Sequence, residues 1–175
     1  MSDSSPPITS TRATTTLAAA TALALILGYL KLYRLPQGGS ITLETVPILL
    51  LALWHGPRLG ILCGCLTGVL KVLLDPFVLH PIQILLDYPV PFALLGLAGM
   101  VPGRPRLGIL LASTGRYLSH VLSGAIFFAH YAPEGVDVWH YALLYNLSYA
   151  GPEALIALLV VPTLLKRILS ASSRT

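Results

Sequence analysis

Hydrophobic residues fall into long runs along this chain, and polar residues gather mainly in the short segments between the runs. Runs of about 20 apolar residues are long enough to cross a bilayer as helices. The pattern predicts six such helices, at residues 13–32, 43–57, 59–74, 82–101, 107–130 and 138–165. The predicted fold class is therefore an all-α integral membrane protein built as a six-transmembrane-helix bundle.

The same pattern predicts the domain organisation. Residues 1–12 are rich in Ser and Pro and are expected to form a disordered cytoplasmic tail, residues 13–166 the membrane domain, and residues 167–175 a second cytoplasmic tail. The run that follows Arg12 ends in basic residues and lacks a small-residue cleavage site. We therefore interpret it as a spanning helix rather than a signal peptide.

Several runs contain residues that predict how the helices pack or bend. Gly60, Gly64 and Gly68 recur every four residues and predict a flat helix face for close packing. The run 82–101 contains Pro89 and Pro91 beside polar residues, so this helix is expected to be kinked or broken.

The composition also indicates a membrane protein, and the distribution of charge and cysteine argues against several kinds of site. The chain is 55% hydrophobic and 10% charged, whereas soluble domains carry roughly 25% charged residues. The net charge of +4 is scattered, which argues against a nucleic-acid surface. Cys63 and Cys65 are two residues apart and so point to different sides of a helix, which disfavours a disulfide or a shared metal.

The basic residues favour one orientation in the membrane. If the N-terminus is cytoplasmic, that side of the bundle carries Arg12, Arg58, Arg104, Arg106, Lys166, Arg167 and Arg174. The opposite side carries Lys31 and Arg34 and the acidic turn at 132–137. The positive-inside rule then predicts that both termini are cytoplasmic.

Polar residues inside the apolar runs indicate a binding site. Arg116, His120 and Asn146 lie in the two aromatic-rich runs on either side of residues 132–137, and Asp87 lies in the run 82–101. Such groups are costly in a bilayer unless they are paired or line a cavity. We therefore expect a cavity in the outward-facing half, with functional roles for Asp87, His120 and Asn146.

Helical spacing places these residues beside aromatic rings. Arg116 and His120 are four residues apart, and Trp139 and Asn146 are seven apart. Three tyrosines repeat every four residues on an adjoining face: Tyr141, Tyr145 and Tyr149. Rings beside an amide and an imidazole suit a flat ligand that is polar or cationic.

Structural interpretations remain open for two of these residues. A contact with Glu153 or Asp87 is favoured over ligand binding for Arg116, and Trp139 fits an interfacial aromatic belt as well as it fits a ligand contact. The sequence has no HExxH, CxxC, GxSxG or P-loop pattern. No metal, cofactor or catalytic site is therefore predicted, and active transport would need a separate ATPase.

The segment SGAIFFAHYAPEGVDVWHYALLYNLSYAGPE resembles the thiamine-specific substrate-binding subunit (S-component) of energy-coupling factor (ECF) transporters. GGSITLETVPILLLALWHG and LLDYPVPFALLGLAG resemble other parts of the same family, so the similarity extends from about Ala13 to Leu165. It implies a multi-pass protein of the prokaryotic plasma membrane that binds thiamine near the outer face. It also implies docking onto a transmembrane coupling protein and two ATPase subunits, with no enzyme activity.

The resemblance also implies roles for individual residues. Asp87 and Tyr88 match an acidic-Tyr pair that binds the aminopyrimidine, although the family favours glutamate at the first position. Phe128 stands where the family tends to have a stacking tryptophan. The implied substrate-binding residues are Asp87, Tyr88, His120, Phe128, Trp139, Tyr141 and Asn146. The small residues Ala18 and Ala22 resemble the face that contacts the coupling protein, and GGSITL resembles the lid between the first two helices.

The resulting hypothesis is a subunit that captures thiamine, as the transported ligand, for ATP-driven uptake. One alternative, raised by Phe128, is an S-component for a thiamine precursor, namely the pyrimidine or thiazole moiety. The other is a small integral membrane enzyme that uses His120, Asp87 and Arg116 on a lipid-like substrate.

Overall fold

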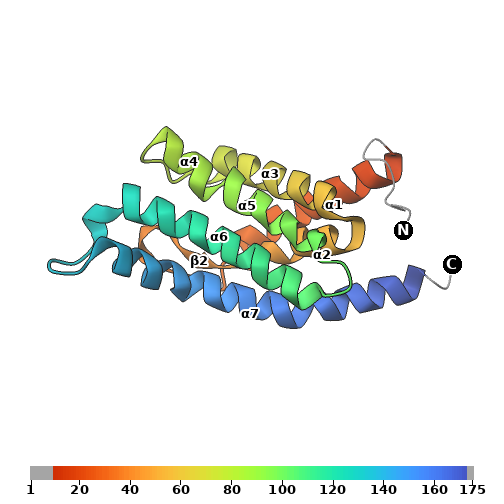
Figure 1. Cartoon of the computed structure of the whole chain (residues 1–175). Coiled ribbons are helices and arrows are strands. Elements are labelled where there is room, and N and C mark those ends of the chain that lie inside the picture. The colour runs from red at the N-terminus through yellow and green to blue at the C-terminus, as the bar shows by residue number, and fades with distance from the viewer. Residues whose placement is uncertain (1–9, 173–175) are drawn as a thin grey trace.

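A computed structural model describes residues 10–172, and across them the chain forms a helical bundle (Figure 1). Two very short strands and three short 3-10 helices complete it. In chain order the elements are α1 (Thr11–Tyr29), β1 (Tyr33–Arg34), η1 (Pro36–Gly38), β2 (Ser40–Ile41), α2 (Thr45–His55), α3 (Pro57–Leu74), α4 (Pro81–Asp87), α5 (Pro89–Leu95), η2 (Gly96–Met100), α6 (Pro105–Phe127), η3 (Ala129–Tyr131) and α7 (Val138–Ser172). With α4, α5 and η2 taken as one broken segment, the predicted bundle of six helical segments is confirmed.

Four of these segments are long and apolar enough to cross a membrane: Thr11–Tyr29, Pro57–Leu74, Pro81–Met100 and Val138–Ala171. α2 is apolar but shorter. α6 has 23 residues, yet Arg116, His120 and two buried serines interrupt its apolar character. The helix with the most polar interior is thus the one expected to face a cavity.

The helices lie side by side along one long axis, and the described chain begins and ends at the same end of the bundle (Figure 1). The turn between α6 and α7 lies at the opposite end. α6 packs along α7, and α3 packs along α5.

The predicted break in the fourth segment is confirmed at Tyr88, which separates α4 from α5. Its backbone is not helical, at φ −122° and ψ −85°. Proline at position 89 has no N–H to continue the helix, and it disfavours a helical conformation at the preceding residue. The break allows α4 to turn away from α5 and brings Asp87, the last residue of α4, next to α6.

The predicted glycine face on α3 is also confirmed. A Cβ atom on Gly64 would lie 1.9 Å from the carbonyl oxygen of Phe92, and one on Gly68 would lie 2.5 Å from the carbonyl oxygen of Tyr88. Only residues without a side chain permit this approach of α3 to the broken segment. The glycines therefore fix the position of the break.

Three boundaries differ from the sequence-based expectation. The loop around residues 36–40 contains an antiparallel pair of strands, in which Tyr33 faces Ile41 and Arg34 faces Ser40. α1 begins at Thr11, and α7 continues to Ser172, into the segment expected as a tail. The expected disorder of the N-terminal tail concerns mainly residues 1–9, and these, like Arg174, lie outside the described residues.

The bundle has two halves with different interiors. The half near the termini, called here the apolar half, has a core of aliphatic and small residues, to which α7 contributes Ala157 and Val161 and α6 contributes Ile109 and Ala112. The other half, called the cavity half, contains the described chain's buried charged residues: Glu44, Arg116 and Glu153.

Candidate ligand-binding cavity

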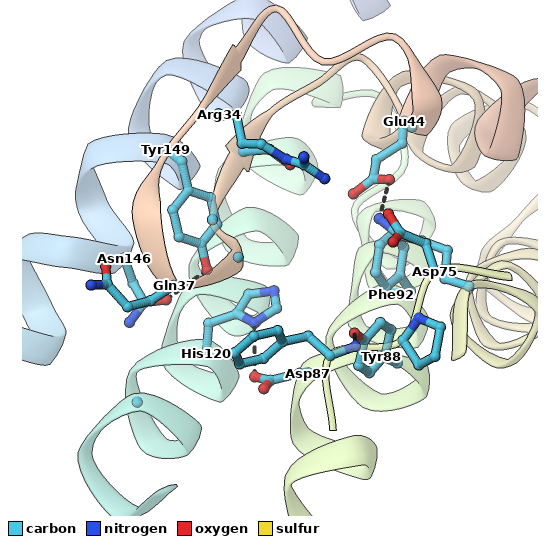
Figure 2. A pocket seen from close by; sticks show the side chains of 18 of the residues that line it. Arg34, Gln37, Glu44, Asp75, Asp87, Tyr88, Phe92, His120, Asn146 and Tyr149 are labelled. Atoms are coloured by element: carbon cyan, nitrogen blue, oxygen red, sulfur yellow. Dashed lines mark hydrogen bonds and ion pairs between the residues drawn. The ribbon is translucent and has the colours of Figure 1, made fainter. Parts of the chain in front are cut away.

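A cavity of about 240 Å³ lies in the cavity half (Figure 2). Its walls come from the end of α1 and the β1–β2 hairpin, from the end of α3 and the segment after it, and from α4, α5, α6 and α7. The break at Tyr88 and the polar part of α6 therefore border the same space.

The structure brings six of the seven predicted binding residues to this cavity: Asp87, Tyr88, His120, Phe128, Tyr141 and Asn146. It does not bring Trp139 there. Trp139 is the second residue of α7, is 52% exposed, and is absent from the cavity lining. The seven-residue spacing from Asn146 correctly relates two positions on one helix face, but Trp139 lies two turns closer to the end of the bundle.

Asp87 is held at the cavity by contacts with Gln83 and His120. Gln83 donates from Nε2 to Asp87 Oδ2 at 2.6 Å, and Nδ1 of His120 lies 3.3 Å from Asp87 Oδ1. The hydroxyl of Ser119 donates to the backbone carbonyl of Leu86 at 2.8 Å, which attaches α4 to α6. Asp87 is the only cavity-lining carboxylate in residues 10–172 that has no Lys or Arg partner.

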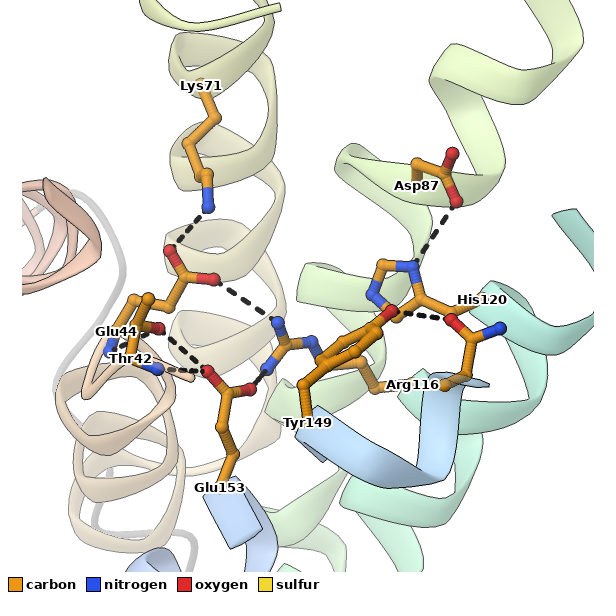
Figure 3. Close-up of polar contacts among 9 residues, drawn as sticks. Thr42, Glu44, Lys71, Asp87, Arg116, His120, Tyr149 and Glu153 are labelled. Atoms are coloured by element: carbon orange, nitrogen blue, oxygen red, sulfur yellow. Dashed lines mark hydrogen bonds and ion pairs between the residues drawn. The ribbon is translucent and has the colours of Figure 1, made fainter. Parts of the chain in front are cut away.

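Next to this site lies a buried network of charges (Figure 3). Arg116 bridges two carboxylates, with Nη1 2.6 Å from Glu153 Oε2 and Nη2 3.2 Å from Glu44 Oε1. Lys71 Nζ lies 2.5 Å from Glu44 Oε2. Thr42 donates its N–H and its hydroxyl to Glu153 Oε1, each at 2.8 Å. The network joins α3, α6, α7 and the segment between the hairpin and α2.

Two positive and two negative groups cancel within this network. Buried charges are tolerated when each is paired and hydrogen-bonded, as here. The expected contact of Arg116 with Glu153 is confirmed, whereas Asp87 pairs with His120 instead of Arg116. Arg116 and Lys71 also lie over the ring of Phe92, each 5.0 Å from its centroid.

Aromatic rings approach the cavity from two sides. Phe77, in the segment after α3, stacks on Phe128 with ring centroids 5.9 Å apart and planes 20° apart. On α7, Tyr141 stacks on Tyr145 with centroids 5.9 Å apart. All four rings border the cavity. They provide flat surfaces against which a planar ligand can stack.

Asn146 is oriented by the protein rather than left free. Its Nδ2 donates to the carbonyl of Ala142 at 2.8 Å, and its Oδ1 accepts from the hydroxyl of Tyr149 at 2.6 Å. A Cβ atom on Gly124 of α6 would lie 3.1 Å from Asn146 Nδ2, so the glycine lets the amide reach the cavity between the two helices. The second hydrogen of Nδ2 has no acceptor among the described residues and can bind a ligand.

Two buried nitrogens at the cavity have no hydrogen-bond partner within the described part of the chain: Nε2 of His120 and Nε of Arg116. Buried polar atoms are nearly always satisfied, so these two indicate where polar ligand atoms belong. Across residues 10–172, no group of three or more His, Cys, Asp or Glu side chains is arranged to hold a metal ion.

The hairpin and its turn cover the cavity. Gln37 adopts a left-handed backbone conformation, with φ 58°, and lines the cavity together with Gly38 and Gly39. The hydroxyl of Tyr145 accepts from the N–H of Gly39 at 3.0 Å and donates to the carbonyl of Pro36. These two bonds attach the turn to α7.

An exposed ion pair lies at the rim. Lys31 Nζ, just after α1, is 2.9 Å from Oδ2 of Asp75, just after α3. The hydrogen bond from Lys31 holds the pKa of Asp75 below its ordinary value. The pair joins two segments that both border the cavity.

Sequence reasoning missed several residues of the site. Glu44, Lys71, Gln83 and Phe77 line the cavity, but they were not among the predicted binding residues. Gln83 could have been found, because it lies one helical turn before Asp87. Glu44 gave no such signal: it precedes α2 in sequence, and only the tertiary fold brings Arg116 to it.

The membrane-length helices and the ligand-sized polar cavity between them define a class of protein, a small membrane-embedded binding protein. Within that class, the chain belongs to the thiamine transporter protein family (Thia_YuaJ), whose family model matches residues 14–172.

Two characterised relatives are similar along most of their length. The thiamine transporter ThiT of Bacillus subtilis (strain 168) is 35% identical over 164 residues, which cover 83% of this chain and 85% of that protein. The thiamine transporter ThiT of Lacticaseibacillus paracasei is 31% identical over 140 residues, covering 69% of this chain and 70% of that protein.

Solved structures share the fold. A structure of ThiT from Listeria monocytogenes superimposes with a TM-score of 0.73 at 21% identity, covering 91% of this chain and 94% of that one. The S component of a bacterial ECF transporter gives a TM-score of 0.56 at 16% identity, with coverage of 92% and 95%. These likenesses establish the six-helix architecture.

Proposed function

We propose that this chain is the thiamine-binding membrane subunit of an ECF-type vitamin transporter, which captures thiamine for ATP-driven uptake across the plasma membrane. Its relatives are named thiamine transporters, and its fold is that of an S component. These names favour intact thiamine over a precursor, and a transported ligand over an enzyme substrate. The proposed role involves no catalysis and no cofactor.

The observation that carries the proposal is the uncompensated carboxylate of Asp87. The network around Arg116 is neutral, and Asp75 is paired with Lys31. Within residues 10–172, Asp87 is thus the cavity-lining carboxylate that pairs with no Lys or Arg, while Arg34 lines another part of the cavity. Thiamine carries one positive charge on its thiazolium ring. Opposite charges in a poorly hydrated site attract strongly, so the part of the cavity next to Asp87 favours a cation.

The polar atoms of the site suit the rest of the molecule. In the proposed pose, Asp87 accepts a hydrogen bond from the amino group of the pyrimidine, with Tyr88 beside it. Nε2 of His120 and the free hydrogen of Asn146 Nδ2 hold the remaining polar atoms of the ligand. Phe128 and Tyr141 stack on the rings, and a cation over an aromatic face adds to the attraction.

The proposed orientation places both termini in the cytoplasm and the cavity toward the outside. The starts of α1, α3 and α6 and the end of α7 lie at the end of the bundle near the termini (Figure 1). These segments and the residue just before α6 include the basic residues Arg12, Arg58, Arg104, Arg106, Lys166 and Arg167. This bias agrees with the positive-inside rule. A cavity in the half away from that end would receive the vitamin from outside the cell.

The proposed partners are a transmembrane coupling protein and two ATPase subunits. Ala18 and Ala22 both lie on the exposed side of α1. Small residues at this spacing let another membrane helix approach closely. The remaining exposed surface of the bundle is strongly apolar and suits contact with membrane lipid.

Calorimetric titration of the purified protein with thiamine tests the proposal. The expected result is saturable binding of one thiamine per chain, and the absence of binding at micromolar thiamine would overturn it. Asp87→Asn is the matched variant: it keeps the size of the side chain but removes the charge, and should weaken binding by about 10- to 100-fold. Calorimetry is preferable to intrinsic fluorescence because neither Trp54 nor Trp139 lines the cavity.

A further inference from the structure

Gln83 connects two parts of the cavity wall through a single side chain. It is 1% exposed and borders the cavity, and it lies one turn before Asp87 on α4. Its Nε2 donates both to Asp87 Oδ2 at 2.6 Å and to the carbonyl of Phe77 at 3.0 Å. Its Oε1 accepts from the N–H of Leu79 at 3.0 Å.

These three contacts leave no choice for the orientation of the amide. A flipped Gln83 would place its NH₂ group against the N–H of Leu79 and its oxygen against a carboxylate and a carbonyl, so every contact would be repulsive. The NH₂ group must therefore face Asp87. Because it can only donate, Asp87 Oδ2 must act as an acceptor.

The same side chain holds the segment between α3 and α4 against the cavity. Besides the two contacts with Gln83, the N–H of Phe77 donates to the hydroxyl of Tyr88 at 2.7 Å. These bonds fix the backbone on both sides of the Phe77 ring, which stacks on Phe128. Loss of the Gln83 amide would leave the carbonyl of Phe77 and the N–H of Leu79 without their partners.

We propose that Gln83 is a positioning residue that determines which ring the cavity accepts. It donates to Asp87 Oδ2 and so keeps that oxygen an acceptor, which favours a ligand ring with an exocyclic amino group beside Asp87, and it holds Phe77 where that ring stacks. The proposal rests on the proposed function, because it takes the aminopyrimidine of thiamine as the ring beside Asp87. It adds that the selectivity for this ring is set by a residue that need not touch the ligand.

The test compares two ligands that differ at one group: thiamine, and the analogue in which the 4′-amino group is replaced by an oxo group. The informative quantity is the ratio of the two affinities, since loosening of the cavity alone would weaken both ligands alike. The unmodified protein should prefer the amino ligand. If it binds neither ligand, the proposed function fails; the inference about Gln83 is judged only from the ratios in protein that binds.

Gln83→Glu is the decisive variant because glutamate has the same shape as glutamine. Two carboxyl groups at hydrogen-bond distance do not both ionise, so the pair binds one proton. Beside an oxo group that proton can sit on Asp87 Oδ1 and be donated to the ligand. Affinity for thiamine should fall by about tenfold or more, and the amino-to-oxo ratio should fall by a similar factor. A ratio that stays within about twofold of the original would overturn the proposal.

Two further variants separate positioning from charge and from folding. Gln37→Glu adds the same charge at the other cavity-lining glutamine, for which the described part of the chain shows no contact with Asp87. In Gln37→Glu the ratio of amino-ligand to oxo-ligand affinity should stay unchanged. A ratio lowered as far as in Gln83→Glu would show a general charge effect and overturn the proposal. Gln83→Met removes the amide without adding charge. It should weaken both ligands by about tenfold and leave the ratio above that of Gln83→Glu.

Discussion

The two halves of this bundle use the same helices for opposite purposes. In the apolar half, α6 and α7 bury Ile109, Ala112, Ala157 and Val161 against one another and their neighbours. In the cavity half, the same two helices bury Arg116 and Glu153 beside a space for a ligand. The change occurs within about one helical turn on each helix, from Ala112 to Arg116 and from Glu153 to Ala157.

This difference shows how a small membrane protein can keep a cavity open. Close packing through glycines and small side chains stabilises one half. The ionic network lies at its border and joins three helices to the segment between the hairpin and α2, so it closes the base of the cavity without filling it. Variants in the two halves should therefore differ in whether they change stability or binding.

The largest expected loss of stability follows from disrupting the ionic network around Arg116, at the border between the two halves. Arg116→Met leaves Glu44 and Glu153 buried without their shared partner, and removal of one member of a buried ion pair costs about 3–5 kcal/mol. The melting temperature in detergent, measured without ligand, should fall sharply. Arg116→Lys keeps the charge but cannot span both carboxylates, so its loss should be smaller. Equal melting temperatures for Arg116→Met and the unmodified protein would contradict the idea that the ionic network stabilises the fold.

The next effect concerns packing in the glycine contact of α3. In Gly64→Ala the new methyl group would lie 1.9 Å from the carbonyl oxygen of Phe92, so α3 and α5 must move apart. A loss of about 1–3 kcal/mol in stability is expected from such overpacking. Gly115→Ala is the control, because its nearest neighbour would be 3.7 Å away. It should be neutral or stabilise α6 by up to about 1 kcal/mol, as alanine favours helix over glycine.

A smaller effect is expected on binding alone. Phe128→Trp offers a larger ring and a stronger attraction for a cation, so thiamine affinity should rise by about 0.5–1 kcal/mol, or a few fold. The separate pyrimidine half of thiamine lacks the thiazolium charge and should show no gain. If both ligands gain equally in calorimetric titrations, the cation does not stack at this position.

The smallest effect is at the rim, where water screens charges. Because Lys31 lowers the pKa of Asp75 in the folded protein, this pair stabilises the fold above the ordinary pKa of an aspartate, and the contribution is lost as the pH falls below about 4. Asp75 is 53% exposed, so the effect should stay below about 1 kcal/mol. The melting temperatures of Asp75→Asn and the unmodified protein should converge as the pH falls from about 5 to about 3. The midpoint should lie near the ordinary pKa of an aspartate, about 4. A constant difference would show that the pair does not titrate in this range.

The helices and part of the cavity could be predicted from the sequence. Apolar runs define the six segments, and prolines mark the break at Tyr88. Asp87, His120 and Asn146 stood out because a polar residue in an apolar run needs a partner, and all three line the cavity.

Other parts of the site depend on distances that a sequence does not contain. Arg116 lies 72 positions from Glu44, and their contact arises only when α2 packs against α6. Trp139 shares a face with Asn146, but spacing gives direction around a helix and not depth along the bundle. Phe77 lies in a connecting segment, where no periodicity indicates which way a side chain points.

The attachment of the hairpin turn to Tyr145 has a consequence for the timing of transport. Passage of a ligand on this side of the cavity requires the turn from Pro36 to Gly39 to detach from α7, which breaks two hydrogen bonds. Association should then be slower than diffusional encounter, and dissociation slower still, because the ligand adds its own contacts to the closed state. Such a protein should hold its ligand for a long residence time, which favours capture at low concentration.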